Sequence, residues 1–159
     1  MGKTLTEQYQ EISNKYMRSG KPWPATTEQI ARWAIEKKLW APQPQSLIKL
    51  CAEQLSEAMR VEYFTDPQGR KVRAKHAARV TERGKQLTLW ADIRSATRGH
   101  MAIAFQQRRQ QVLGECHQLK TDVDSYNQNG NPGKQIEMIF DFTMDLAEWD
   151  VADRTGIKI

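Results

Sequence analysis

The chain has 159 residues, enough for one domain or for a small domain with an extension. Hydrophobic residues make up 39% and charged residues 27%, a balance typical of a folded protein with a modest core. No apolar run reaches the length of a membrane span, and the first residues lack the apolar region of a secretory signal. The two cysteines, Cys51 and Cys116, indicate a reducing compartment. We therefore expect a cytoplasmic protein with no membrane partner.

The net charge of +5 is unevenly distributed along the chain. Residues 60–109 carry 12 Lys and Arg against 4 Asp and Glu, whereas residues 110–159 carry 4 against 9. A basic middle next to an acidic end indicates a surface for a polyanion beside a segment with another role. The alternative is that the two halves neutralise each other.

The first sixty residues have the apolar periodicity of three helices. The first is predicted over Thr4–Arg18 and is followed by Gly and Pro residues that end it. Thr26 and Gln29 form a capping-box pattern for the second helix, which is predicted to end near Trp40. A third helix is predicted over Ser46–Arg60, with Ser46 as its N-cap.

The pattern then changes to that of β-strands and tight turns. Residues 61–65 are rich in strand formers, and Asp66–Gly69 is a strong turn sequence. A strand is predicted over Lys71–Ala77, a second turn over Glu82–Lys85, and a last strand over Gln86–Trp90. Three short helices followed by an antiparallel ribbon are the element order of a winged helix-turn-helix domain.

The remaining residues are predicted to form a long helix and a tail. The helix runs from Ser95 to about Tyr126, and a loop follows over Asn127–Gly133. Apolar residues recur every seven positions in it: Phe105, Val112, Leu119 and Tyr126. This spacing suits a homodimer through residues 101–126, although Arg108 and Glu115 at the complementary seam positions weaken a strict zipper. Packing of this helix back onto the winged helix is the equal alternative. The tail over Gln135–Phe142 fits a strand or a helix equally well, and residues 135–149 are a candidate docking segment for a protein partner.

Residues from about Leu5 to Arg73 resemble the HARE-HTH winged-helix family, whose members occur in chromatin regulators, restriction enzymes and a bacterial RNA polymerase subunit. The resemblance rests on Gly20-Lys21-Pro22, Glu28-Gln29-Ile30, Lys38-Leu39-Trp40, Leu47, Gln54-Leu55-Ser56 and the basic ribbon after Phe64. Ala41–Gln45 departs from the family's usual basic, threonine-containing linker. The resemblance implies a winged-helix, DNA-binding protein of a bacterial or phage-type family.

The expected fold class is therefore mainly α with a small antiparallel β-ribbon. A winged helix-turn-helix domain is expected over residues 1–93, followed by a long helix and an acidic C-terminal extension over residues 94–159. The alternative to DNA binding is a protein–protein adaptor that uses the winged helix and the long helix to dock on a larger assembly.

The candidate nucleic-acid-binding residues lie on the third helix and, above all, on the ribbon. Lys71, Arg73 and Lys75 alternate, so that one strand would place them on the same face. Few cations lie on the exposed face of the third helix, so we expect double-stranded DNA to be held by phosphate contacts from the ribbon, with weak sequence preference. The alternative is a solvated edge that cations protect from aggregation. The full set is Lys49, Arg60, Arg70, Lys71, Arg73, Lys75 and Arg79.

No motif in the sequence indicates an enzyme. The His and Cys residues lack the spacing of a zinc site, and neither a phosphate-binding glycine loop nor a nucleophile elbow occurs. Asp141, Asp145 and Glu148 would share one helix face, which a solvated acidic surface explains without metal chemistry. We expect no catalytic residues, no metal and no cofactor.

Overall fold

A computed structural model describes residues 2–42 and 47–157. It is mainly helical with a small amount of antiparallel β-structure, as the sequence predicts. The chain divides into two compact units, residues 1–50 and residues 51–159. The domain boundary that we expect after residue 93 stays a prediction. None of the described helices is long and apolar enough to cross a membrane.

Helices α1 (Leu5–Arg18) and α2 (Thr27–Glu36) begin where the sequence predicts, because each has a complete capping box. The Thr26 hydroxyl accepts a hydrogen bond from the Gln29 amide at 3.2 Å, and the Gln29 side chain accepts one from the Thr26 amide at 2.8 Å. The same exchange begins α1 at Thr4. Two backbone amides that the helix leaves unpaired are thereby satisfied at each start.

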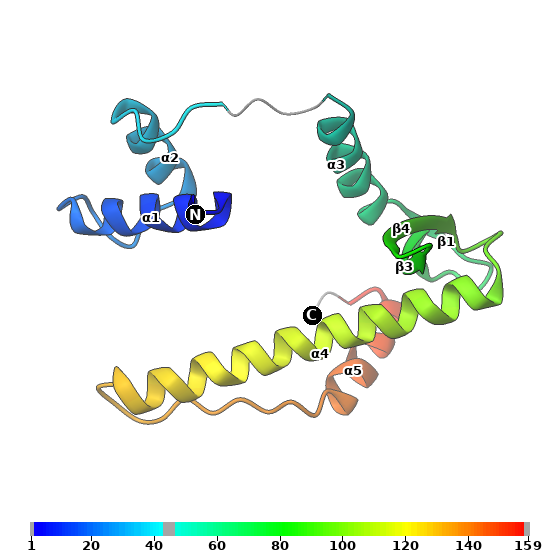
Figure 1. Cartoon of the computed structure of the whole chain (residues 1–159). Coiled ribbons are helices and arrows are strands. Elements are labelled where there is room, and N and C mark those ends of the chain that lie inside the picture. The colour runs from blue at the N-terminus through cyan, green and yellow to red at the C-terminus, as the bar shows by residue number, and fades with distance from the viewer. Residues whose placement is uncertain (1, 43–46, 158–159) are drawn as a thin grey trace. The chain divides into compact units, whose positions relative to one another are not determined.

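The small core between α1 and α2 is aromatic. Tyr16 is 4% exposed, and its ring meets Trp33 edge to face at 5.4 Å and Trp23 at 6.1 Å between centroids. Its hydroxyl donates to the carbonyl of Pro22 at 3.4 Å. Ala34 is buried beside them and lets the two helices approach. Tyr16 therefore anchors this pair of helices, which Figure 1 shows in blue.

Helix α3 (Leu47–Arg60) has the length predicted for it, and the expected N-cap, Ser46, lies outside the described residues. Its apolar stripe is solvent-exposed: Leu47, Leu50 and Leu55 are 81%, 39% and 55% exposed. No residue of α3 is buried.

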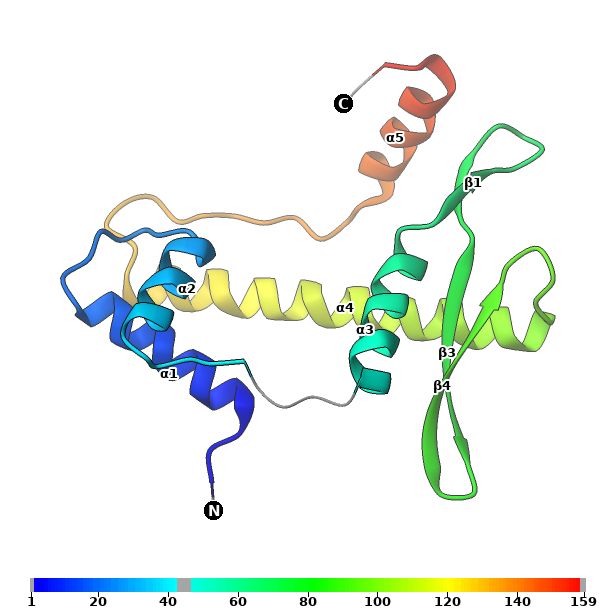
Figure 2. The same cartoon turned by 90° about the horizontal axis from the view of Figure 1, so that it is seen from above.

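The chain forms two hairpins, one at each predicted turn, but the single strand predicted over Lys71–Ala77 is wrong, because it is divided at Ala74 between the two. Strands β1 (Tyr63–Thr65) and β2 (Lys71–Arg73) pair with each other, and β3 (Lys75–Glu82) pairs with β4 (Lys85–Asp92). The change of partner occurs at Ala74, whose amide donates to the Glu62 carbonyl and whose carbonyl accepts from the Ile93 amide, both at 2.9 Å. Figure 2 shows the two hairpins extending in opposite directions from this junction.

The turns of both hairpins form where the sequence predicts. In the first turn the Asp66 carboxylate accepts from the amides of Gln68 and Arg70 at 3.0 and 2.8 Å. In the second, Arg83 and Gly84 have φ angles of 47° and 77°, the left-handed pair that a two-residue hairpin turn requires.

Helix α4 (Arg98–Asn129) packs against β3 through its first three turns. Ala78 and Ala104 are both buried, and the Phe105 ring meets the His76 ring edge to face at 5.3 Å. The Gln107 amide accepts from the backbone N–H of Arg79 and donates to the carbonyl of Arg79, both at 2.7 Å. The helix thus covers the edge of β3 that β4 leaves unpaired.

The tail is neither the strand nor the helix that the sequence leaves open for residues 135–142. Residues 135–142 have no regular structure, and α5 (Thr143–Thr155) follows them. The Asn127 side chain donates to the Ile136 carbonyl and accepts from the Ile136 amide, which turns the chain back along α4.

We expect Tyr16→Ala to lower the free energy of unfolding by about 3 kcal/mol, because it empties the space between two indole rings. Tyr16→Phe removes only the hydroxyl and its long hydrogen bond, and should cost less than about 1 kcal/mol. Urea denaturation followed by tryptophan fluorescence measures both. Equal losses for the two variants would contradict an aromatic core at this position.

Candidate nucleic-acid interface

Most cations of residues 60–109 make no ion pair with another described residue. All of these residues are described, and three of their twelve cations, Arg70, Lys75 and Arg94, lie in salt bridges. Glu62, Asp66 and Asp92 are the acidic partners in these salt bridges. Glu82, the fourth acid of the segment, is in none of them. The excess of positive charge on this segment is therefore not neutralised within it.

The remaining cations belong to the two hairpins, the end of α3 and the start of α4. They are Arg60, Lys71, Arg73, Arg79, Arg83, Lys85, Arg98, Arg108 and Arg109.

Lys71 and Arg73 flank the exposed ring of Tyr63. The register of the first hairpin places Tyr63 opposite Arg73. Lys71 lies two residues before Arg73 on β2, so both side chains are on the same face. The Lys71 ammonium lies 4.9 Å and the Arg73 guanidinium 5.9 Å from the centroid of the Tyr63 ring. These contacts hold two cations side by side on one face of the hairpin.

The Tyr63 hydroxyl reports how positive this face is. A hydrogen bond from Arg73, 3.5 Å long, lowers the pKa of Tyr63, and the charges of Arg73, Lys71 and Arg108 lower it further. The Nε atom of Arg73 is buried and makes no hydrogen bond to the described residues. The basic face is thus defined by Tyr63, Lys71, Arg73 and Arg108, the three cations whose charges act on the Tyr63 hydroxyl and the ring that carries it.

The expectation that Lys75 shares the face of Lys71 and Arg73 is wrong. Its ammonium lies 3.1 Å from Glu62 and 3.2 Å from Asp92, and its side chain is 27% exposed. Hydrogen bonds to Glu62 and then Asp92 raise the pKa of Lys75. The two carboxylates converge because Glu62 precedes β1 and Asp92 ends β4, at the point where the hairpins meet. Lys75 therefore joins the hairpins together.

Arg70 is also held by an acid, at the first hairpin turn. Its Nε donates to Asp66 at 2.7 Å, and its amide donates to the other oxygen of the same carboxylate. These bonds, the backbone one first, lower the pKa of Asp66 below its usual value. Arg70 thus completes the turn, and a phosphate would have to compete with Asp66 for it.

The three other predicted residues are exposed. Arg60 ends α3 and lies 5.9 Å from the Trp90 ring. Arg79 lies in the middle of β3, where Gln107 fixes its backbone. Lys49 lies in the first turn of α3, in the unit of residues 1–50.

The nucleic-acid-binding residues predicted from the sequence do not include Tyr63 and Arg108, the other two members of the basic face. Arg108 follows Ala104, a buried residue of α4, by four residues. Residues four apart lie on the same side of a helix, and this spacing could have indicated Arg108. Sequence reasoning also missed that Arg94 is bound to Asp92, at 2.7 Å, and covers the Phe64 ring at 4.5 Å.

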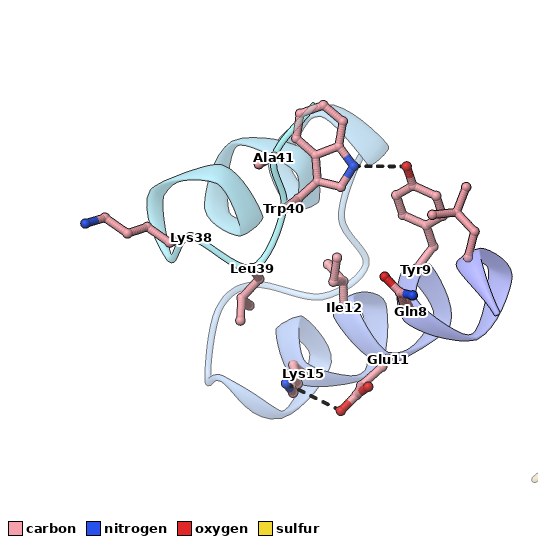
Figure 3. A pocket seen from close by; sticks show the side chains of 10 residues that line it. Gln8, Tyr9, Glu11, Ile12, Lys15, Lys38, Leu39, Trp40 and Ala41 are labelled. Atoms are coloured by element: carbon pink, nitrogen blue, oxygen red, sulfur yellow. Dashed lines mark hydrogen bonds and ion pairs between the residues drawn. The ribbon is translucent and has the colours of Figure 1, made fainter. Parts of the chain in front are cut away.

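The first unit contains a shallow pocket of about 340 Å³ between α1 and the segment after α2. Figure 3 shows the Trp40 indole, which donates to the Tyr9 hydroxyl at 2.9 Å, and the pair of Lys15 and Glu11 at 3.4 Å. Four of the polar side chains that line the pocket are therefore engaged in two pairs. Among the described residues no group of His, Cys, Asp and Glu side chains is placed to hold a metal.

Comparison with protein-family models, with curated proteins and with solved structures finds no match to this chain.

We expect Asp92→Asn to lower the thermal midpoint at pH 7, because Asp92 holds both Arg94 and Lys75. Hydrogen bonds from Arg94, and then from Lys75, keep the pKa of Asp92 well below the value of about 3.9 that it has in an unfolded chain. Its stabilising effect is thus present above pH 4 and is lost as the pH falls toward the folded pKa. Thermal unfolding between pH 7 and pH 2 should show the difference between wild type and variant shrinking in acid. A difference that is constant with pH would contradict this role for the carboxylate.

Proposed function

We propose that the protein binds double-stranded DNA, mainly through phosphate contacts and with weak sequence preference. The observation that carries the proposal is the set of nine cations without ion pairs on residues 60–109, two of which Tyr63 holds together. Cations that already have a carboxylate partner gain little from a phosphate, whereas free ones release bound counterions when they contact DNA.

The basic face suits phosphates better than base edges. Lys71 presents a compact point charge, and the Arg73 guanidinium offers several donors in a plane, so the pair can contact adjacent phosphates. The exposed part of α3 carries Glu53 and Glu57 beside Lys49 and Arg60, a poor set for reading bases in the major groove. Phosphate contacts position a protein on DNA without selecting a sequence, which is the basis for the weak preference that we propose.

The proposed fold of this DNA-binding part is a winged helix of the HARE-HTH type. The order of α1, α2, α3 and a following hairpin supports it, and so does the helical periodicity of the apolar residues in α3. In such a domain the stripe would form part of the helical core, and the β1–β2 hairpin would be the wing.

A second candidate function is docking to a protein through residues 135–149. Met144, Leu146 and Trp149 on and before the middle of α5 are 71%, 64% and 64% exposed. They lie among acidic residues, a mixture typical of partner-docking segments. This adaptor function takes first place if DNA binding fails the following test.

Fluorescence anisotropy of labelled duplex DNA, titrated at several salt concentrations, tests the first proposal. With about five phosphates contacted, the logarithm of the binding constant should fall with the logarithm of the salt concentration with a slope of about −4.5. Lys71→Ala with Arg73→Ala should weaken binding and reduce the magnitude of the slope by about 2. The matched control, Lys21→Ala with Lys37→Ala, removes the same charge from the first unit and should leave the slope near that of the wild type. No binding at low salt, or equal effects of the two double variants, would contradict the proposed interface.

The winged-helix proposal has its own test in the free energy of unfolding. If the α3 stripe is part of a helical core, Leu55→Ala should cost about 2 kcal/mol or more. Val61→Ala changes an exposed aliphatic residue outside the stripe and should stay within about 0.5 kcal/mol of the wild type. Urea denaturation of the full chain compares them, and a Leu55 variant as stable as the Val61 variant would overturn the proposed core.

A further inference from the structure

The apolar stripe along α4 is uncovered over most of its length. Val112, Leu119 and Tyr126 are 55%, 45% and 47% exposed, and Phe105 precedes them by one heptad. Consecutive members lie seven residues apart, so on a helix of 3.6 residues per turn each is displaced by only about 20° from the last. An uncovered stripe with this period fits the seam of a coiled coil.

A second row of small and apolar side chains completes the heptad pattern. Taking the stripe as position a would put Arg108 and Glu115 at position d. Taking it as position d instead places Cys116 and Val123 at position a, three residues before Leu119 and Tyr126. The seam then reads Val112, Cys116, Leu119, Val123 and Tyr126 without a charged residue. Arg109 occupies the preceding position a, and its charge weakens the seam on that side.

The charges beside the seam favour a parallel partner of identical sequence. In a parallel pair Glu115, at position g, faces Lys120 of the second copy at position e. Lys120 already pairs with Asp124 of its own helix, and it can bridge both acids. In an antiparallel pair centred on the same stripe, position g faces position g, so Glu115 would instead lie near Asp122 of the second copy, and like charges repel.

We propose that the protein forms a parallel homodimer in which α4 pairs with α4 of a second copy along residues 112–126. The returning segment borders this seam at its end, because Asn127 holds Ile136. The interface begins at Val112, five residues after Gln107, the last α4 residue that is hydrogen-bonded to β3. The inference is independent of DNA binding, since none of the seam residues belongs to the basic face.

Light scattering after size-exclusion chromatography should give about twice the chain mass of 18.4 kDa at tens of micromolar protein. Leu119→Gln removes an apolar side chain from each side of the seam and should raise the dissociation constant by on the order of a hundredfold. Ile103→Gln is the matched control, because Ile103 is 41% exposed and lies on α4 away from the stripe. A monomeric wild type, or equal effects of the two substitutions, would overturn the proposal. Far-UV circular dichroism confirms that α4 stays helical in both variants.

Cross-linking tests the parallel arrangement. In a chain with Cys51→Ala and Cys116→Ala, Val123→Cys places one thiol at position a near the end of the seam. In a parallel dimer the two thiols face each other, and the oxidant diamide should join them into a disulfide-linked dimer. In an antiparallel dimer they lie at opposite ends of the seam. A dimer that diamide fails to cross-link would overturn the parallel arrangement, and a cross-link that forms equally with Leu119→Gln would show collision of monomers and overturn it as well.

Discussion

The backbone of Ala74 connects two hairpins that run in different directions. Its amide continues the ladder of β1 and β2 through the Glu62 carbonyl, and its carbonyl begins the ladder of β3 and β4 through the Ile93 amide. Ala74 is 1% exposed, so no larger side chain fits at this junction without displacing its neighbours. Glu62 and Asp92 are brought together at this junction, where both form ion pairs with Lys75. The junction thus also determines which cations are held in ion pairs and which stay available.

The division of cations into held and free ones has a simple geometric origin. The acids of residues 60–109 lie at strand ends and in a turn, where a neighbouring Lys or Arg can reach them at short range. Lys71 and Arg73, at the two ends of β2, and the cations on the first turns of α4 have no such carboxylate partner among the described residues, and they keep their charge uncompensated. Tyr63 orders two of them by ring contact without reducing their charge. Net charge alone describes this surface poorly, since structural and free cations occur within three residues of one another.

Local features of the structure could be predicted from the sequence, and long-range ones could not. Thr4 and Thr26 mark the starts of α1 and α2, and Asp66 and Gly84 mark the hairpin turns, because capping and turn geometry depend on a few adjacent residues. The change of partner at Ala74 left no such signal, because the alternation of side chains is the same on both sides of it. Lys75 likewise looks identical to Lys71 and Arg73 in the sequence. Its partners lie 13 and 17 residues away, and only the fold brings them together.

The side-chain amide of Gln107 makes position 107 far less tolerant of substitution than its exposure alone would indicate. One side-chain group supplies a donor and an acceptor to the two backbone atoms of Arg79, and in doing so imitates the strand that β3 lacks on this edge. A glutamate has the same shape but no donor, and would set a carboxylate against a carbonyl oxygen. Asparagine has the right group on a shorter stem, and lysine or arginine offers donors alone. A surface residue of the kind that usually varies freely is thus constrained by chemistry to a single side chain, and a catalogue of buried positions would overlook it.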